Sequence, residues 1–334
     1  MKKRLILFAM LLGLTALASC TKEIKFRGSE SEPRLVLYSL ARAGEPLEVE
    51  VSESVFFLNS ESGKAFVSDL DVTAGTVKLY VNGGSVPYSL TRREPQKIDV
   101  DGDGIPDYED LPAAPLYYDA PYAPKGGDRL RIEADFPGFD PVSAEITVPV
   151  CTSLTVDSVT EKEGVASYWG TTHICEMTLT VKQGADPSCF YAITPCLRST
   201  DPDNGEIYLS TLTLESDDYI FQGNGTQDQI NQLLSDDSVD KVFADTMLPS
   251  DTYTFRCRFE MPDLQFYRDE GVSIDVYLLF TTMGRDLYYY RLSRSQVGYT
   301  SFGFLSEATE LYSNVVGGYG CFCARSSVEI PLGL

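Results

Sequence analysis

Short runs in which apolar and polar residues alternate dominate the chain from residue 35 onward. A period of two places one face of a strand against a core and the other face in water. Turn residues separate these runs at Asn82-Gly83-Gly84 and Lys125-Gly126-Gly127, where glycine accepts a positive φ. The runs of the first half lie at residues 35–38, 47–51, 77–81, 130–134 and 144–148. Residues 34–150 are therefore predicted to form a β-sandwich of immunoglobulin-like or prealbumin-like type.

The second half, from about Cys151, continues the β pattern. Its most regular run, at 173–182, places five residues on one face: His173, Cys175, Met177, Leu179 and Val181. Further strands are predicted at 190–193, 253–260, 273–281 and 288–292. One short helix is predicted near 226–234, where Thr226 and Gln229 have the spacing of a capping box. These signals predict a mainly β protein, with a larger sandwich-type domain over 151–334.

The first 19 residues differ from the rest. A basic head at 2–4 precedes an apolar run at 5–17, which is shorter than the roughly 20 residues of a membrane span. Leu17-Ala18-Ser19-Cys20 has the form of a bacterial lipoprotein processing site, with small residues before a thiol that takes the lipid. We therefore predict a signal peptide at 1–19, lipidation at Cys20 and a polar tether at 20–33. A short transmembrane anchor is the alternative.

The net charge of the chain argues against one class of binding partner. The chain carries 27 basic and 49 acidic side chains, a formal net charge of −22. Cleavage of the signal removes three basic residues and no acidic ones, which leaves 24 basic against 49 acidic side chains and a net charge of −25. No cluster of Lys and Arg follows Cys20, so the sequence argues against nucleic-acid binding.

A calcium-like loop at 99–110 is the sharpest chemical signal. Counted from its first residue, carboxylates occupy positions 1, 3, 5, 9 and 12, and Gly104 at position 6 lets the chain turn around an ion. The predicted ligands are Asp99, Asp101, Asp103, Asp107, Asp110 and the backbone carbonyl of Ile105. This spacing resembles the calcium repeats of thrombospondin type 3 and predicts structural Ca²⁺ in an insertion between two strands. A solvated acidic turn is the alternative.

Other candidate sites are weaker. His173 is the only histidine and lies on an apolar strand face, where a hydrogen-bonded structural residue is expected. Seven cysteines remain after Cys20, an odd number whose pairing stays open, and Cys321 and Cys323 suit packed thiols better than a metal site. Tyrosines at 117, 118 and 122 and at 288–290 could form binding platforms or pack across strands.

The closing segment points to a family. Residues 286–293 and 310–324, and above all Ser313-Asn-Val-Val-Gly-Gly-Tyr-Gly, resemble the C-terminal signature of a Bacteroidota outer-membrane lipoprotein family, domain of unknown function 4249. Cys20-Thr-Lys-Glu-Ile and the segment 127–149 are similar to its N-terminal part. The resemblance implies an outer-membrane lipoprotein encoded beside TonB-dependent receptors, with an Ig-like or prealbumin-like first domain and no established enzymatic activity. The calcium-like loop is not part of that pattern.

These observations favour a non-enzymatic lipoprotein that partners a TonB-dependent outer-membrane transporter. Display at the cell surface is favoured over the periplasmic face, because the charged residues Lys22 and Glu23 follow closely after Cys20, although a polar tether alone also explains this pair. A calcium-stiffened adhesive or structural module is a second hypothesis. A carbohydrate-active enzyme is the third, since a glycosidase needs only two carboxylates and leaves no longer motif.

Overall fold

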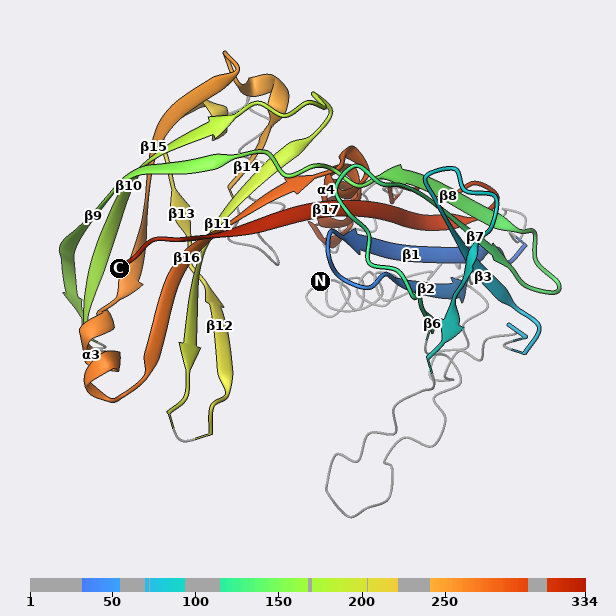
Figure 1. Cartoon of the computed structure of the whole chain (residues 1–334), viewed down its shortest axis with the longest axis horizontal. Coiled ribbons are helices and arrows are strands. Elements are labelled where there is room, and N and C mark those ends of the chain that lie inside the picture. Colours follow the sequence, from blue (N-terminus) through green and yellow to red (C-terminus); the bar gives the residue numbers. More distant parts are fainter. Residues whose placement is uncertain are drawn as a thin grey trace, which may run out of the picture. The chain divides into compact units, whose positions relative to one another are not determined.

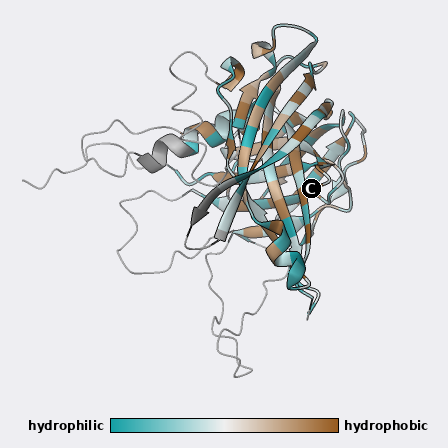
Figure 2. Cartoon of the chain, turned by 90° about the vertical axis from the view of Figure 1, so that its left-hand side faces the viewer, coloured by the Kyte–Doolittle hydropathy of each residue, from teal (hydrophilic) through white to brown (hydrophobic). Residues whose placement is uncertain are grey.

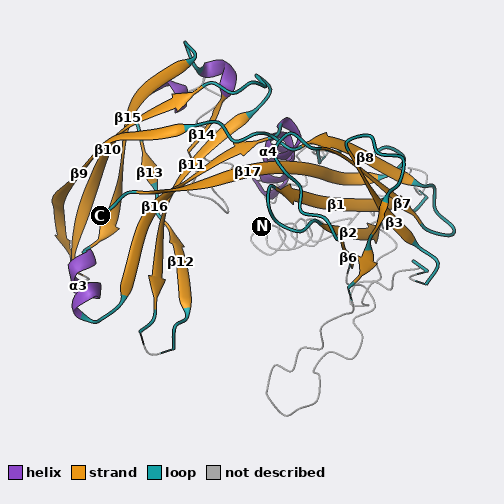
Figure 3. Ribbon diagram, viewed as in Figure 1, coloured by secondary structure: helices purple, strands orange, loops and turns teal. Residues whose placement is uncertain are grey.

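The computed structural model describes residues 32–54, 70–71, 73–93, 115–167, 170–202, 204–221, 241–299 and 311–334. The predicted signal peptide, Cys20, the calcium-like loop and the short helix at 226–234 lie outside the described residues. Within them the protein is mainly β, as predicted, and Figure 3 shows strands in most of the described chain.

The largest sheet has nine strands. They are β1 (Leu35–Arg42), β2 (Glu48–Glu53), β5 (Thr91–Arg92), β6 (Leu116–Asp119), β11 (Phe190–Thr200), β12 (Ile207–Thr211), β14 (Lys241–Ala244), β16 (Ser273–Met283) and β17 (Tyr319–Pro331). Their order is β12-β11-β16-β17-β1-β2-β6-β5, and β14 pairs with β11 (Figure 1). The sheet therefore draws strands from both ends of the chain.

Two four-stranded sheets complete the β structure. One contains β3 (Thr76–Val81), β4 (Tyr88–Ser89), β7 (Arg129–Asp135) and β8 (Val142–Thr147), in the order β4-β3-β7-β8. The other contains β9 (Leu154–Ser167), β10 (Gly170–Lys182), β13 (Leu214–Glu215) and β15 (Thr252–Pro262), in the order β13-β15-β10-β9. The described helical segments are α3 (Leu264–Asp269), α4 (Arg285–Tyr299), η1 (Tyr219–Phe221) and η2 (Asp245–Met247).

Alternating side chains build a separate hydrophobic core under each four-stranded sheet. In the first core, Leu37 of β1 and Val49 of β2 pack with Ile132 of β7. In the second, Leu179 of β10 and Phe280 of β16 are fully buried in the same cluster. Figure 2 shows hydrophobic and hydrophilic residues alternating along the strands. The faces that the sequence pattern assigns to these strands are confirmed.

The last strand joins the two regions. β17 pairs in parallel with β1, from Val36↔Tyr319 to Arg42↔Arg325, and antiparallel with β16. Phe322 belongs to the first core, whereas Ile330 packs against the second. The domain boundary near residue 150 stays a prediction, and the structure adds that one strand serves the cores on both sides of it.

The strand predicted at 288–292 is wrong, because these residues lie in the helix α4. Leu287 and Tyr288 are buried in a third cluster that also contains Cys321 and Cys323 of β17. Tyr288 stacks on Phe190 with ring centroids 3.7 Å apart. Aromatic residues favour strands on average, but here tertiary packing selects a helix whose one side covers the sheet.

Candidate functional site

A groove lies over the solvent-facing side of the sheet β13-β15-β10-β9 and has a volume of about 730 Å³. Strand register aligns its floor in two rows. Thr178 of β10 lies between Ser158 of β9 and Arg256 of β15. In the adjacent row, Glu176 lies between Thr160 and Arg258. The groove is therefore built by the polar positions of strands whose apolar positions form the second core.

The lining is polar wherever side chains face the groove. Hydroxyl groups come from Ser158, Thr160, Thr178 and Thr254. Charged groups come from Glu176, Glu215, Asp217, Asp218, Arg256 and Arg258. Met177, Phe255 and Cys257 also border the groove, but their side chains are buried on the opposite face of the sheet.

Ion pairs neutralise part of this charge. Lys162 Nζ lies 2.6 Å from Glu176 Oε2, and Arg258 Nη2 lies 2.8 Å from Glu215 Oε2. The hydrogen bond to Glu215 raises the pKa of Arg258. Arg256 differs from Lys162 and Arg258, because its guanidinium forms no ion pair within the part of the chain that the structure describes. Within that part of the chain, Arg256 is the cation of the groove lining that could pair with a ligand.

One wall of the groove is the segment between β13 and η1. Ser216 Oγ donates a 2.6 Å hydrogen bond to the Arg256 carbonyl, which fixes this segment along β15. Asp218 accepts hydrogen bonds from the Tyr253 hydroxyl at 3.1 Å to both carboxylate oxygens and from the Ile220 N–H at 3.2 Å. Burial, together with these bonds to Asp218, raises the pKa of Tyr253. Hydrogen bonds within the chain therefore fix this wall of the groove without a bound ligand.

This arrangement suits a polar solute. Carboxylate and hydroxyl oxygens accept hydrogen bonds, hydroxyl groups also donate them, and a guanidinium offers five donors in a fixed plane. An apolar ligand would find no exposed apolar side chain on the floor. The groove can therefore recognise the hydroxyl, amide or carboxylate groups of a hydrophilic molecule.

The predicted lipidation site, Cys20, and all six predicted calcium ligands, Asp99, Asp101, Asp103, Ile105, Asp107 and Asp110, lie outside the described residues. The strands on either side of the calcium-like loop are described. β5 and β6 pair antiparallel, with Thr91 opposite Asp119. The loop therefore belongs to the segment that connects two paired strands, as expected.

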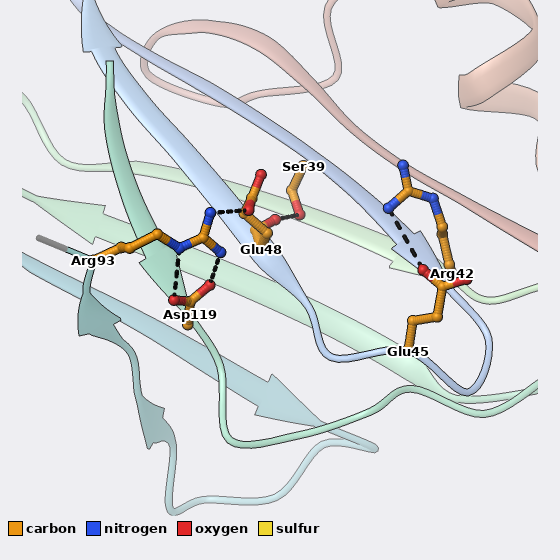
Figure 4. Close-up of polar contacts among 6 residues, drawn as sticks. All are labelled: Ser39, Arg42, Glu45, Glu48, Arg93 and Asp119. Atoms are coloured by element: carbon orange, nitrogen blue, oxygen red, sulfur yellow. Dashed lines mark hydrogen bonds and ion pairs between the residues drawn. The ribbon is translucent and has the colours of Figure 1, made fainter. Parts of the chain in front are cut away.

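Ion pairs hold the base of that segment together (Figure 4). Arg93, the first residue after β5, contacts Glu48 of β2 at 2.6 Å and also pairs with Asp119 of β6. Hydrogen bonds to Asp119 and Glu48 raise the pKa of Arg93. Ser39 of β1 donates to the Glu48 carbonyl at 2.6 Å. Arg93 thus links the ends of neighbouring strands. A separate pair, between Arg42 and Glu45 at 3.7 Å, lies where β1 ends.

Two general features concern the described residues only. No group of three or more His, Cys, Asp or Glu side chains lies close enough there to hold a metal ion. None of the helices in those ranges combines the length and the apolar composition needed to cross a membrane.

His173 is a hydrogen-bonded residue at the start of β10, as the sequence pattern predicts. Its Nδ1 lies 2.6 Å from Glu161 Oε1 on β9. Its Nε2 lies 4.0 Å from an oxygen of Asp263, whose carboxylate caps the N-terminus of α3. The imidazole therefore connects the β9–β10 hairpin to the start of a helix.

The tyrosines of the two predicted platforms play mixed roles. Tyr118 is buried in the first core, and the Tyr122 hydroxyl donates to Asp128 at 2.6 Å. On α4, Tyr288 is buried against Phe190 and Tyr290 packs on Tyr38 with centroids 5.6 Å apart. For these residues the structure supports packing, while Tyr289 remains exposed.

All seven cysteines after Cys20 are described and occur as free thiols. Six are buried, among them Cys321 and Cys323, whose prediction as packed thiols is confirmed. Burial raises the pKa of the Cys175, Cys189 and Cys257 thiols to about 12 in each case. These thiols are protonated at neutral pH and therefore poor nucleophiles.

The groove itself was not predicted from the sequence. The alternation at 173–182 places Glu176 and Thr178 on a solvent-facing side, but it does not indicate which strands lie beside them. A groove over a sheet depends on register between strands, here between β10 and the distant β15. The recurring hydroxyl and charged residues on these strands were the available signal.

A scan of the chain against models of known protein families gives no match, and a search of curated proteins finds no relative. The likeness to the outer-membrane lipoprotein family therefore stays a prediction from the motifs quoted above.

Proposed function

We propose that this chain is a lipid-anchored, non-enzymatic outer-membrane protein that captures a polar solute for a TonB-dependent transporter. The observation that carries the proposal is the groove over β13-β15-β10-β9, with its polar lining and the guanidinium of Arg256, which has no ion-pair partner among the described residues. The processing motif ending at Cys20 supports a lipid anchor, and the family resemblance supports the transporter as partner. The anchor would keep the groove close to the membrane that contains the transporter.

A pull-down from the native outer membrane tests the partnership. The tagged, lipidated protein is extracted in mild detergent, and co-purifying proteins are identified by mass spectrometry. We expect a TonB-dependent β-barrel in stoichiometric amount. Recovery of the lipoprotein alone would contradict the transporter role and favour the adhesive or structural hypothesis. Cys20→Ser is the control for anchoring, because it removes the thiol that takes the lipid and should release the protein from the membrane fraction.

Arg256→Gln tests whether the groove captures the solute. This variant removes the open guanidinium without adding bulk, so uptake through the co-purified transporter should slow while the amount of barrel in the pull-down stays unchanged. Arg129→Gln is the matched control, because Arg129 is an exposed arginine on the other four-stranded sheet. Equal uptake by both variants would remove the groove from the proposal.

Calcium is the proposed structural cofactor of the loop at 99–110. Occupancy at ten times the dissociation constant would stabilise the folded state by about 1.4 kcal/mol. Millimolar Ca²⁺ should therefore raise the melting temperature, and Asp101→Ala and Asp103→Ala should abolish the rise. Asp140→Ala, at an exposed position outside the loop, should retain it. A parent protein without any calcium-dependent rise would leave the solvated acidic turn as the better interpretation.

The carboxylates of the groove give a second candidate function. Glu176, Glu215, Asp217 and Asp218 border one cavity, and glycoside hydrolysis requires two carboxylates that flank the scissile bond. Turnover on a panel of glycans that is lost in single Glu→Gln or Asp→Asn variants of these four residues would establish an enzyme. Absence of turnover with intact uptake would favour the binding protein.

A further inference from the structure

Strand β12 is an uncharged, exposed strand at the end of the nine-stranded sheet. It pairs with β11 and has no second partner strand among the described residues. All five of its residues are exposed, including Ile207 at 60 % and Leu209 at 66 %. Such an edge offers unpaired peptide groups together with apolar side chains.

The hydrogen-bond pattern shows which peptide groups point outward. The Asp201 N–H donates to the Glu206 carbonyl, and the Leu212 N–H donates to the Pro195 carbonyl. In an antiparallel ladder, hydrogen-bonded pairs alternate with pairs whose peptide groups face away. Counted from these two bonds, Tyr208 and Ser210 bond to β11. The N–H and C=O groups of Ile207, Leu209 and Thr211 therefore point to the free edge.

The other outer strands of the three sheets are protected. β14 also pairs only with β11, but it has four residues, of which Val242 and Phe243 are fully buried. β4, β5 and β13 contain only two residues each. β9 has a charged sequence that includes Glu161, Lys162 and Glu163, and β8 is bridged by Val316 at Ser143. Short length, charge and cover are the usual devices that keep sheet edges from pairing. β12 has none of them, although the same chain uses them at its other edges.

Charge indicates the chemistry of an occupant. Glu206 directly precedes β12, Asp201 lies opposite it in the hairpin, and the whole chain has a net charge of −22. A segment that pairs with β12 would place its own end residues near these carboxylates. Lys or Arg at those ends would be attracted, whereas Asp or Glu would be repelled. A second copy of this acidic chain is therefore a poorer occupant than a basic strand.

We propose that the free edge of β12 binds an extended segment of another protein by strand addition. The segment contributes backbone hydrogen bonds to Ile207, Leu209 and Thr211, apolar side chains beside Ile207 and Leu209, and a basic residue near Glu206. Strand addition of this kind takes affinity from the main chain and specificity from alternate side chains. The site lies on a different sheet from the groove and does not depend on the groove's ligand.

The test uses synthetic peptides and the full-length protein. The probe is a fluorescent peptide of sequence Lys-Val-Thr-Val-Thr-Val-Lys, and binding is followed by anisotropy. We expect the same peptide with a central proline, and one with glutamate at both ends, to bind at least about tenfold more weakly. Equal affinity of all three peptides would show that neither strand pairing nor charge determines binding and would overturn the proposal.

Variants of the protein locate the site. Leu209→Lys places a charge at the edge, and Leu209→Pro removes an outward N–H that β11 does not use. Each should weaken binding at least about tenfold while circular dichroism shows a folded protein. Val86→Lys, which adds the same charge at an exposed apolar position in a turn, should bind like the parent. Unchanged binding in both Leu209 variants would overturn the proposal.

A concentration-dependent dimer in sedimentation that Leu209→Lys abolishes would also overturn the proposal, because the occupant of the edge would then be a second copy of this chain.

Discussion

Single buried polar residues show how this fold satisfies its hydrogen bonds. Asp245 in η2 is fully buried, yet its carboxylate accepts bonds from the Tyr191 hydroxyl at 2.5 Å, Gln183 Nε2 at 3.1 Å and the Gly184 N–H at 2.9 Å. A buried carboxylate is tolerated only with such partners. Burial and the bond to Asp245 also raise the pKa of Tyr191.

Asp245→Ala should lower the free energy of unfolding by about 2–3 kcal/mol, because it leaves the buried Tyr191 hydroxyl and the half-buried Gln183 amide without this acceptor. Urea denaturation followed by circular dichroism measures the loss. Asp251→Ala, at a nearby exposed position, should change stability by less than about 0.5 kcal/mol. Equal losses in both variants would mean that the network around Asp245 contributes little.

Asp128 should make stability depend on acid pH. Burial alone would raise its pKa, but bonds from Tyr122, Asn82 and the Lys125 N–H outweigh burial and lower the pKa below 3.8. The carboxylate therefore stabilises the folded state above the unfolded pKa, and this contribution is lost as pH falls through the lowered folded-state value.

The variant Asp128→Ala tests this pH dependence. It should be less stable than the parent by about 1–2 kcal/mol at pH 7, and the difference should shrink as the pH falls from 4 toward 2. Unfolding free energies measured across that range for both proteins check the prediction. A difference that stays constant with pH would assign the loss to packing instead of the charge.

At the scale of elements, α4 is the main surprise. The tyrosine-rich segment 288–292 has the composition of a strand, and its alternation is too short to separate the two possibilities. The structure makes it helical, with Leu287 and Tyr288 against the sheet and Asp286 in the first turn, where a negative charge favours a helix. The Tyr312 hydroxyl also donates to Asp286 at 2.5 Å.

Adjacent tyrosines on α4 provide a matched test of this packing. Tyr288 is 5 % exposed and stacks on Phe190, whereas Tyr289 is 41 % exposed. Tyr288→Ala should therefore destabilise the protein by about 3 kcal/mol, and Tyr289→Ala by less than about 1 kcal/mol. Urea unfolding of both variants checks the ranking. The reverse order would mean that the helix is positioned differently.

At the scale of the whole molecule, the parallel pair β1–β17 joins the two halves of the nine-stranded sheet. Gly320 has a φ of +112°, and a Cβ at this position would lie 2.0 Å from the Leu37 carbonyl oxygen. Only glycine lets the two backbones approach so closely. Gly320, near the start of the last strand, is therefore a point of close contact between β17 and β1.

Gly320→Ala should lower the free energy of unfolding by at least about 2 kcal/mol more than Gly333→Ala. The second variant is the control, because Gly333 also has a positive φ, +68°, but nothing lies within 4 Å of its added Cβ. Chemical denaturation of both proteins separates the cost of the close approach from backbone strain. Equal destabilisation would show that the close approach to Leu37 adds nothing to the cost of a side chain at Gly320.

Local pattern and long-range pairing differ in how far the sequence reveals them. The strand at 173–182 and the turn at Asn82-Gly83 follow from neighbouring residues, and both are confirmed. The pairing of Leu37 with Gly320 joins residues from opposite ends of the chain, and no local signal specifies it. The groove shares this property, because Thr178 and Arg256 become neighbours only through the register of β10 and β15.

The position of β17 has a consequence for biosynthesis. Phe322 and Ala324 fill the first core, whose other strands are made long before them. Until the ribosome has translated residues 319–331, β1 and β16 lack the strand that lies between them. A nascent chain therefore cannot complete the nine-stranded sheet before its last residues are made. A product that stops short of the last strand leaves one edge of β1 and one edge of β16 without a partner, and unpaired edges of this kind invite aggregation.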